Sequence, residues 1–177
     1  KYDYDITRQY LGKSLCVLRP ANTAEVAAIL KIANEHLVPV VPQSGNTGLA
    51  GGASISALQD TIILSTDRMN RILDINPVSR VAKVEAGVVL ANLHAAVAQH
   101  GLTFPLLFGA RGSCMIGGNL STNAGGSNVV RYGNTRALCL GLEVVTPAGE
   151  IVNLMSELHK DNTGYDLKDL FIGAEGT

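Results

Sequence analysis

The chain has 177 residues, which is enough for one domain or two small ones with a hydrophobic core. Its formal net charge of −1 argues against a nucleic-acid-binding protein, because a phosphate backbone requires a basic surface. No apolar run approaches the roughly 18 residues that a membrane-crossing helix needs, so no such helix is predicted.

Cysteine and histidine usage shows no metal-binding pattern. Cys16, Cys114 and Cys139 are odd in number and widely spaced, so we expect free thiols in a reducing compartment. The cytoplasm is the expected location, and a mitochondrial or membrane-peripheral one is left open. His94 and His100 would point about 120° apart on one helix, and the other histidines are scattered. No metal site is therefore predicted.

The first elements indicate mixed α and β structure. A short strand over residues 14–18 precedes a helix with Thr23 as its N-cap and an end near His36. A second strand follows over residues 38–41. This strand–helix–strand order predicts a βαβ unit with a parallel pair of strands.

A first glycine-rich stretch occupies residues 42–52, ahead of an apolar run at 61–64. Its four glycines would weaken a helix or a strand, so we expect a loop whose backbone N–H groups converge on an anion. No Lys or Arg occurs from Val38 to Asp67, so dipoles would hold that anion in place of full charges. The stretch is predicted to bind a pyrophosphate, and a mobile surface loop is the alternative.

The later part of the chain is predicted to contain both strands and helices. An alternating run over residues 80–86 is typical of a half-exposed antiparallel strand, with Ala82, Val84 and Ala86 on one face. The remaining expected elements are strands at 61–65, 72–75, 138–146 and 151–153, a helix marked by Leu90, Leu93 and Val97 that ends at Gly101, and a last helix that starts near Asp166.

A second glycine-rich stretch covers residues 109–126 and carries almost no charge apart from Arg111. Small residues dominate it, so the surface could lie against a planar polar ring and hydrogen-bond its edge. Tight helix–sheet packing is the alternative explanation of the small residues. Packing alone does not require the polar side chains that recur here, which are Ser113, Asn119, Ser121, Thr122 and Asn123.

Three common motifs are absent. There is no Gly-x-x-x-x-Gly-Lys-Ser/Thr phosphate loop, no Gly-x-Gly-x-x-Gly at a first strand–helix turn, and no Gly-x-Ser-x-Gly elbow. The predicted phosphate loop runs from strand to strand, which differs from both common nucleotide-binding folds.

Four stretches, at residues 42–52, 117–126, 160–167 and 173–177, resemble the FAD-binding domain of FAD-linked oxidases. This is the vanillyl-alcohol-oxidase or p-cresol-methylhydroxylase type of flavin domain. Within it, the chain is most similar to the D-2-hydroxyacid dehydrogenases, a group that includes D-2-hydroxyglutarate dehydrogenase, D-lactate dehydrogenase and the glycolate oxidase flavin subunit. The resemblance covers nearly the whole chain, in order.

The resemblance implies an α+β domain of two lobes with FAD between them. Residues 1–75 would form a small βαβ lobe with the pyrophosphate loop. Residues 76–177 would form a larger lobe with a mixed or antiparallel sheet and flanking helices, which lines the flavin and is cut short at its C-terminal end. A substrate domain would follow beyond Thr177, so we expect the chain to be a piece of a longer protein, inactive by itself.

The resemblance also implies which residues bind FAD. The pyrophosphate would be wrapped by Pro42, Ser44, Gly45, Asn46, Thr47, Gly48 and Gly52; the flavin and ribityl chain would contact Gly112, Ser113, Gly117, Asn119, Ser121, Thr122, Asn123, Gly125 and Gly126; Glu175 and Gly176 would lie near the adenosine end. Some relatives tether the flavin through a His in the first loop. That loop has no His here, so non-covalent FAD is expected. Cys114 would lie beside the flavin ring and could bond it covalently, but a buried inert thiol is the usual case.

The implied reaction transfers a hydride from the α-carbon of a small 2-hydroxy acid to the flavin. Its catalytic residues cannot be named, because the substrate domain that would carry them is absent. The implied partners are the substrate and an electron acceptor such as a quinone, a cytochrome or a flavoprotein, and a homodimer is compatible with the resemblance.

Two other functions stay open at this point. One is a flavoprotein of another substrate class, such as an alkylglycerone-phosphate synthase or a reductase of enolpyruvyl-nucleotide sugars. The other is a nucleotide-binding module without catalysis. Arg111 is expected either to reach a substrate carboxylate or the flavin edge, or to lie on the surface, and His94 is expected to be exposed.

Overall fold

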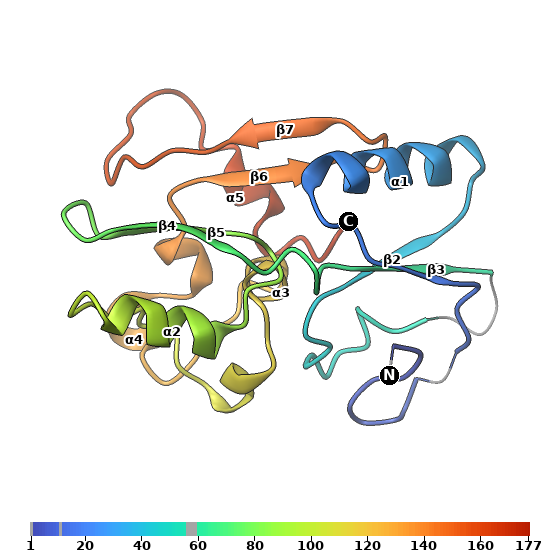
Figure 1. The fold of residues 1–177 in the computed structure, drawn as a ribbon, viewed down its shortest axis with the longest axis horizontal. Helices are drawn as coiled ribbons and strands as arrows, with labels where there is room; N and C mark the ends of the chain where they lie inside the picture. Colours follow the sequence, from blue (N-terminus) through green and yellow to red (C-terminus); the bar gives the residue numbers. More distant parts are fainter. Residues whose placement is uncertain (1, 11, 56–59) are drawn as a thin grey trace.

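The computed structural model describes residues 2–10, 12–55 and 60–177. In Figure 1, β2 and β3 lie on the right, the β4–β5 hairpin and α2 lie on the left, and α3 lies near the centre. The strands are β1 (Val17–Leu18), β2 (Val40–Gln43), β3 (Ile62–Ser65), β4 (Ile72–Asn76), β5 (Val81–Val84), β6 (Leu142–Val145) and β7 (Ile151–Leu154). The helices are α1 (Thr23–Glu35), α2 (Leu90–Ala98), α3 (Ile116–Ser121), α4 (Val129–Tyr132) and α5 (Lys168–Phe171), with 3₁₀ turns η1 (Gly109–Gly112) and η2 (Thr135–Leu138). The predicted α+β class is confirmed.

The first sheet is parallel and has the strand order β1-β3-β2. The prediction that β1 and β2 form a hydrogen-bonded parallel pair is wrong, because β3 lies between them. Strand β3 lies at the centre because it is the most buried: Ile63 and Ser65 are fully buried, and Leu64 is nearly so. The first glycine-rich stretch leaves β2 and returns to β3, as predicted, so it lies at the carboxyl end of β2.

Helix α1 begins one residue earlier than predicted, because Asn22 and not Thr23 is its N-cap. Oδ1 of Asn22 accepts a hydrogen bond from the backbone N–H of Glu25 (2.9 Å), and Oε2 of Glu25 accepts one from the backbone N–H of Ala21 (2.8 Å). This arrangement is similar to a capping box, except that Glu25 bonds the N–H of the residue before the N-cap. The Thr23 hydroxyl instead donates to Oε1 of Glu143 in β6 (2.7 Å), so it joins α1 to the neighbouring hairpin.

Two antiparallel hairpins, β4–β5 and β6–β7, form the other sheets among the described residues. The predicted alternation in β5 is wrong at Ala82, which is exposed. The register shifts between Ile72 and Asp74, where β4 carries one residue more than β5, and such a bulge disrupts the alternation of faces. The expected lobe boundary after residue 75 falls inside β4, so the β4–β5 hairpin spans it.

The main hydrophobic core lies between α2 and the start of α3. Leu90, Leu93 and Val97 of α2 point into it, as the helical spacing predicted. Cys114 and Ile116 enter the same core from the second glycine-rich stretch. None of the helices in the described ranges has both the length and the apolar character for crossing a membrane.

The side-chain cap of Asn22 allows a direct test of where α1 begins. Asn22→Ala should lower the free energy of unfolding by about 1 kcal/mol, because the N–H of Glu25 loses its partner. Urea unfolding measures this change. Asn34→Ala is the matched control: Asn34 is exposed on α1 and its side chain hydrogen-bonds no described residue, so this variant should be neutral or slightly stabilising. Equal losses for the two variants would contradict the assignment.

Candidate functional site

The two glycine-rich stretches lie against each other. A Cβ atom on Gly45 would lie 2.2 Å from the carbonyl oxygen of Ser113 and 2.8 Å from Cα of Cys114. A Cβ on Gly118 would lie 3.1 Å from Cβ of Ser44. Because glycine has no side chain, the two backbones can approach this closely. Stretches that are far apart in the sequence therefore form one continuous surface.

The C-terminal segment, residues 172–177, joins this surface. A Cβ on Gly52 would lie 3.0 Å from Oε2 of Glu175, and one on Gly176 would lie 3.5 Å from Cγ of Pro42. Figure 1 shows the C-terminus near the middle of the view, close to β2. Three of the four motif stretches singled out in the sequence thus converge, whereas residues 160–167 form an exposed loop.

Several glycines in the site are explained by packing within the chain, which was the alternative left open. A Cβ on Gly126 would lie 2.1 Å from the carbonyl oxygen of Leu107, and one on Gly117 would lie 2.8 Å from Cβ of Ala86. Gly125 is similarly close to Oδ1 of Asn134 (2.9 Å). These glycines are needed to fold the surface, whatever it binds.

Other glycines have open space around them. Gly48 and Gly112 are exposed, and a Cβ on either would have nothing within 4 Å. Packing among the described residues does not require glycine at these two positions. They leave the backbone free for close approach by a ligand.

The second stretch contains helix α3, which the sequence analysis did not assign. Gly117 and Gly118 are poor helix formers, and they hid the pattern. Contacts from outside the helix hold its start: Ile116 N–H donates to the carbonyl of Val88 (2.9 Å) and Gly117 N–H to that of Ala86 (2.7 Å). Tertiary contacts therefore override local propensity here.

Three of the polar side chains predicted to meet the cofactor, those of Asn46, Thr122 and Asn123, bond backbone groups of the chain. Nδ2 of Asn46, a residue with φ of 50°, donates to the carbonyl of Tyr4 (2.8 Å). Oδ1 of Asn123, with φ of 47°, accepts from the N–H of Arg136 (2.9 Å), and the Thr122 hydroxyl donates to the carbonyl of Gly118. Among the predicted site residues, the hydroxyls of Thr47, Ser113 and Ser121 make no hydrogen bond to another described residue.

Asn119 is the predicted site residue with an unused buried donor. The residue is 3% exposed, and its Nδ2 atom makes no hydrogen bond of normal geometry with the described residues. A buried donor without an acceptor is costly, so a ligand that accepts a hydrogen bond would stabilise it. The amide lies near Cys114: burial raises the pKa of that thiol, and Asn119 opposes the rise. Cys114 is therefore a buried, neutral thiol, as expected.

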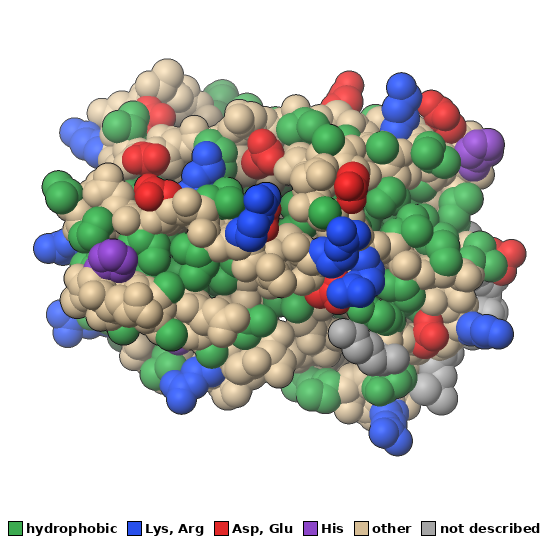
Figure 2. Space-filling model, viewed as in Figure 1, with side chains coloured by type: hydrophobic (Ala, Val, Ile, Leu, Met, Phe, Trp, Pro, Cys, Tyr) green, Lys and Arg blue, Asp and Glu red, His purple; other side chains and the backbone are tan. Residues whose placement is uncertain are grey.

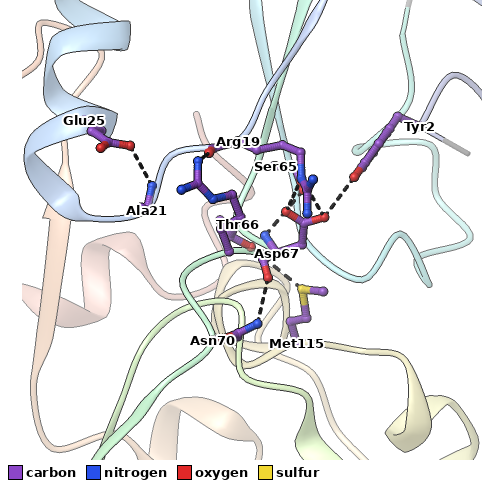
Figure 3. A network of polar contacts seen from close by, with 10 residues as sticks. Tyr2, Arg19, Ala21, Glu25, Ser65, Thr66, Asp67, Asn70 and Met115 are labelled. Atoms are coloured by element: carbon purple, nitrogen blue, oxygen red, sulfur yellow. Dashed lines mark hydrogen bonds and ion pairs between the residues drawn. The ribbon is translucent and has the colours of Figure 1, made fainter.

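A turn after β3 supports both glycine-rich stretches, and Figure 3 shows its contact with Met115 of the second. The Thr66 hydroxyl lies 3.1 Å from Oγ of Ser44 and 3.9 Å from Sδ of Met115. The carbonyl of Thr66 also fills the space where Gly87 lacks a side chain, 2.0 Å from a Cβ there. One residue thus contacts the first stretch, the second stretch and the chain between them.

The neighbouring Asp67 carboxylate ties distant segments to this turn. Nε of Arg19 lies 2.8 Å and 3.1 Å from its two oxygens, and the Tyr2 hydroxyl donates to Oδ2 at 2.8 Å. Figure 3 shows these groups directed at the carboxylate from the end of β1 and from the N-terminal segment. Neither Thr66 nor Asp67 was predicted from the sequence, since neither belongs to a motif.

Gln43 was also missed, although it lies inside the first motif. It is 2% exposed, and its Nε2 donates to the carbonyls of Tyr2 and Ala53, each at 3.0 Å. The amide holds the far side of the loop to its start. A polar residue directly after an apolar strand could have indicated this role, but the stretch was predicted to be a loop.

The N-terminal segment, residues 2–10, lies along the first stretch. Besides the contacts of Tyr2 and Tyr4, the ring of Tyr10 lies 2.7 Å from where Gly51, with φ of 83°, would carry a Cβ. Asp5 is 1% exposed and accepts from the N–H groups of Thr7 (2.9 Å) and Tyr10 (3.1 Å). These internal bonds give the segment a defined shape.

Two residues with open alternatives are now placed. Arg111 is exposed on η1 and makes no ion pair with the described residues. The expectation for His94 is wrong: it is half-buried, with its ring 6.4 Å from that of Phe104, because this face of α2 meets the Phe104 segment. In the described ranges, no group of three His, Cys, Asp or Glu side chains could hold a metal ion.

The charged side chains show no single-sign field on the face drawn in Figure 2. Lys and Arg side chains alternate there with Asp and Glu and with hydrophobic groups. Apart from Arg111 and Glu175, the candidate site consists of neutral groups: backbone N–H, hydroxyl and amide. Such a set suits an anion held by dipoles together with a neutral polar ring.

Comparison with known proteins agrees with this geometry. A family described as FAD binding domain matches residues 14–155. The chain is 51% identical over 173 residues to a mitochondrial D-2-hydroxyglutarate dehydrogenase of Bos taurus, covering 98% of this chain and 31% of the relative. It is 47% identical over 176 residues to a D-2-hydroxyglutarate dehydrogenase of Xanthomonas citri, covering 99% and 37%. It is 48% identical over 176 residues to a D-2-hydroxyglutarate–pyruvate transhydrogenase of Saccharomyces cerevisiae, covering 99% and 35%. The chain thus spans about a third of the length of these relatives.

The fold is also found in solved structures of alkyldihydroxyacetonephosphate synthase. Two of them superpose with TM-scores of 0.78 and 0.79 at 22% identity, covering 91% of this chain and 28% and 29% of theirs. At this identity the likeness concerns the fold alone. The family match covers more than half of the chain, and it includes both glycine-rich stretches that the structure brings together. The chain therefore belongs to the family of FAD binding domains, and its cofactor is FAD.

Proposed function

We propose that this chain is the FAD-binding part of a dehydrogenase that oxidises the CH–OH group of a D-2-hydroxy acid. The observation that carries the proposal is the convergence of the two glycine-rich stretches and the C-terminal segment on one surface. The names of relatives that are 47–51% identical over nearly the whole chain support the substrate class, with D-2-hydroxyglutarate as the first candidate. Because the chain spans about a third of those relatives, the activity belongs to the whole protein.

The residues present fit FAD. Gly48 and Gly112 leave open backbone, and Asn119 offers a buried donor that lacks an acceptor. No cation lies between residues 38 and 66, so the N–H groups of the first stretch would bind the pyrophosphate. Each hydrogen bond to a charged oxygen contributes roughly 1.5–3 kcal/mol, so a few of them suffice. In this proposal the flavin and ribityl chain contact residues 112–126, and the adenosine end lies near Glu175 and Gly176.

When bound, FAD supplies the acceptor for the hydride from the substrate α-carbon. The chain's own residues bind and orient it. The Ser44–Gly45 backbone packs against Ser113, Cys114 and α3 as one closely packed wall, because Gly45 and Gly118 carry no side chain that would separate them. Asn119 Nδ2 would fix the position of one acceptor atom. Cys114 lies beneath this wall in the core and stays neutral, since burial raises the pKa of its thiol.

The groups that take the substrate proton and bind its carboxylate belong, in this proposal, to a further domain of the whole protein. In the same proposal, residues 1–75 and 76–177 form two lobes, and the whole protein forms a homodimer. The electron acceptor is either a carrier, namely a quinone, cytochrome or flavoprotein, or a 2-keto acid, which the name of the yeast relative suggests. For the compartment, we propose the cytoplasm or, as in the name of the Bos taurus relative, the mitochondrion.

Cofactor choice tests the proposal first. At a concentration of about one hundred times its Kd, FAD should stabilise the protein by roughly 2.7 kcal/mol. That corresponds to a rise of roughly 5–10 °C in the melting temperature for a domain of this size. FMN should have a smaller effect and NAD none, as measured by thermal melting with each ligand.

Failure of FAD to stabilise the protein, or equal stabilisation by NAD, would overturn the FAD site. The substrate class is tested with the whole protein under anaerobic conditions. D-2-Hydroxyglutarate should bleach the visible flavin absorbance, while L-2-hydroxyglutarate serves as the control. If D-lactate alone bleaches the flavin, the substrate is another 2-hydroxy acid than D-2-hydroxyglutarate. If no 2-hydroxy acid bleaches it, the proposed dehydrogenase activity is contradicted.

Two glycines in the same loop should respond differently to a methyl group. Gly45→Ala should lower the free energy of unfolding by about 1–3 kcal/mol, because its Cβ meets the Ser113 carbonyl at 2.2 Å. Gly48→Ala should leave stability within about 0.5 kcal/mol but weaken FAD binding roughly tenfold. Urea unfolding and FAD titration measure the two effects. Unchanged FAD affinity in Gly48→Ala would show that this glycine does not face the cofactor.

The flavin should be bound without a covalent link. The first loop contains no His, and the Cys114 thiol is buried and protonated, so it is a poor nucleophile. Acid precipitation of the FAD-loaded protein should therefore leave the flavin in the supernatant. A yellow pellet would mean that the flavin is covalently attached. If the Cys114→Ser variant loses the colour, Cys114 is the attachment residue; if the colour persists, another residue is.

A further inference from the structure

Arg136 contacts two segments of the site at once. It lies in η2, and its backbone N–H donates to Oδ1 of Asn123, in the loop after α3 (2.9 Å). Its guanidinium Nη2 donates to the carbonyl of Ile172, at the start of the C-terminal segment. Ile172 is 1% exposed, so this carbonyl belongs to a fixed part of the chain.

The C-terminal segment is attached to the end of α3 beside this arginine. The N–H of Gly173 donates to the carbonyl of Leu120, and that of Glu175 to the carbonyl of Ser121, each at 3.0 Å. These carbonyls belong to the last turn of α3, where helix carbonyls lack partners inside the helix. The segment therefore caps α3 with its own backbone.

Gly173 shows how tightly the segment is held. Its φ is 85°, and a Cβ there would lie 3.2 Å from Nη2 of Arg136 and 3.3 Å from Cβ of Asn123. The guanidinium thus lies directly against the backbone that it bonds. A side chain at this position would both strain the backbone and push the segment away from Arg136.

Charge on α5 supports the arginine from the other side. Oδ1 of Asp169 lies 4.0 Å from Nε of Arg136 and 3.6 Å from Nζ of Lys168. Lys168 pairs with Asp166 as well. The guanidinium is therefore held between a carboxylate on α5 and the carbonyl of Ile172, which restricts where it can point.

The consequence reaches the first glycine-rich stretch. The segment that Arg136 holds carries Glu175, whose Oε2 lies 3.0 Å from where Gly52 would bear a Cβ. It also carries Gly176, which lies beside Pro42. Among the described residues, Arg136 contacts the second stretch at Asn123 but has no bond to the first, so its side chain can act on the first loop through residues 172–176.

We propose that Arg136 is a positioning residue for the cofactor: it fixes residues 172–176 on the end of α3 and so places Glu175 against the first loop. The inference rests on the proposed function, which puts Glu175 and Gly176 near the adenosine end of FAD. FMN lacks that end. Loss of Arg136 should therefore weaken FAD binding and spare FMN binding.

The test measures amide exchange in the cofactor-free protein together with the Kd values of FAD and FMN. In Arg136→Ala, the amides of Gly173 and Glu175 should exchange roughly tenfold faster or more, because their hydrogen bonds open more often. The Kd of FAD should rise roughly tenfold and that of FMN by less than about twofold. Arg136→Lys, which keeps a charged donor, should fall in between. Arg131→Ala is the control, since the Arg131 side chain makes a cation–π contact with Tyr132 and no hydrogen bond or ion pair with another described residue.

A second variant keeps the arginine and displaces the segment. Gly173→Ala should reproduce the FAD-selective loss, because its Cβ meets both Arg136 and Asn123. Gly164→Ala is its matched control: φ is 69° there as well, but nothing lies within 4 Å of a Cβ. It carries the backbone strain without the displacement, so FAD affinity should not change.

The outcomes separate this inference from the proposed function. Equal loss of FAD and FMN affinity, or unchanged exchange of the two amides in Arg136→Ala, overturns the role of Arg136 while the FAD site stands. A wild-type protein that does not bind FAD overturns both. An FAD-selective loss in Arg136→Ala and Gly173→Ala, absent from both controls, supports the assignment.

Discussion

The structure depends on one close backbone contact, where Gly45 of the first glycine-rich stretch meets Ser113 and Cys114 of the second. Because no side chain separates the two backbones, the loop after β2 and the chain that leads into α3 hold each other in place. Thr66 reinforces the contact from below by touching Ser44 and Met115. Residues 172–177 also contact both stretches, at Pro42 and Gly52 of the first and at Leu120 and Ser121 of the second. A displacement at Gly45 would therefore shift the second stretch and, through it, residues 172–177.

The polar groups are divided between support and binding. The charged side chains that support the surface are bonded: Asp67 to Arg19, and Arg136 to Asp169 and the carbonyl of Ile172. The surface itself carries Arg111 and Glu175 among backbone N–H groups and hydroxyls, and the amide of Asn119 is buried in the second stretch. Because the supporting charges are bonded to other groups outside the surface, an anionic ligand can bind without first breaking an ion pair. This arrangement also explains why a protein of nearly balanced charge can bind a dinucleotide.

The sequence was sufficient for the class of fold, the first helix and the stretches that meet, because these follow from hydrophobic periodicity and glycine clusters. It was insufficient for strand order, since β3 takes the central position through burial that only the assembled sheet defines. It also missed α3, whose glycines are tolerated because Ala86 and Val88 bind its first N–H groups. Thr66, Asp67 and Arg136 could not be found, because their roles arise from residues distant in sequence. Asn46 and Asn123 were singled out, but they hold backbone carbonyl and amide groups in this structure.

The N-terminal segment has a consequence for where this domain is cut in recombinant work. The family match begins at residue 14, yet residues 2–10 supply the carbonyls that Gln43 and Asn46 bind and the ring that packs on Gly51. A fragment trimmed to the family boundary would leave the buried Gln43 amide with one acceptor in place of two. Such a fragment would keep every glycine of the first stretch but lose the contacts of residues 2–10 that hold this loop in its conformation. The functional unit therefore begins before the part of the sequence that identifies it.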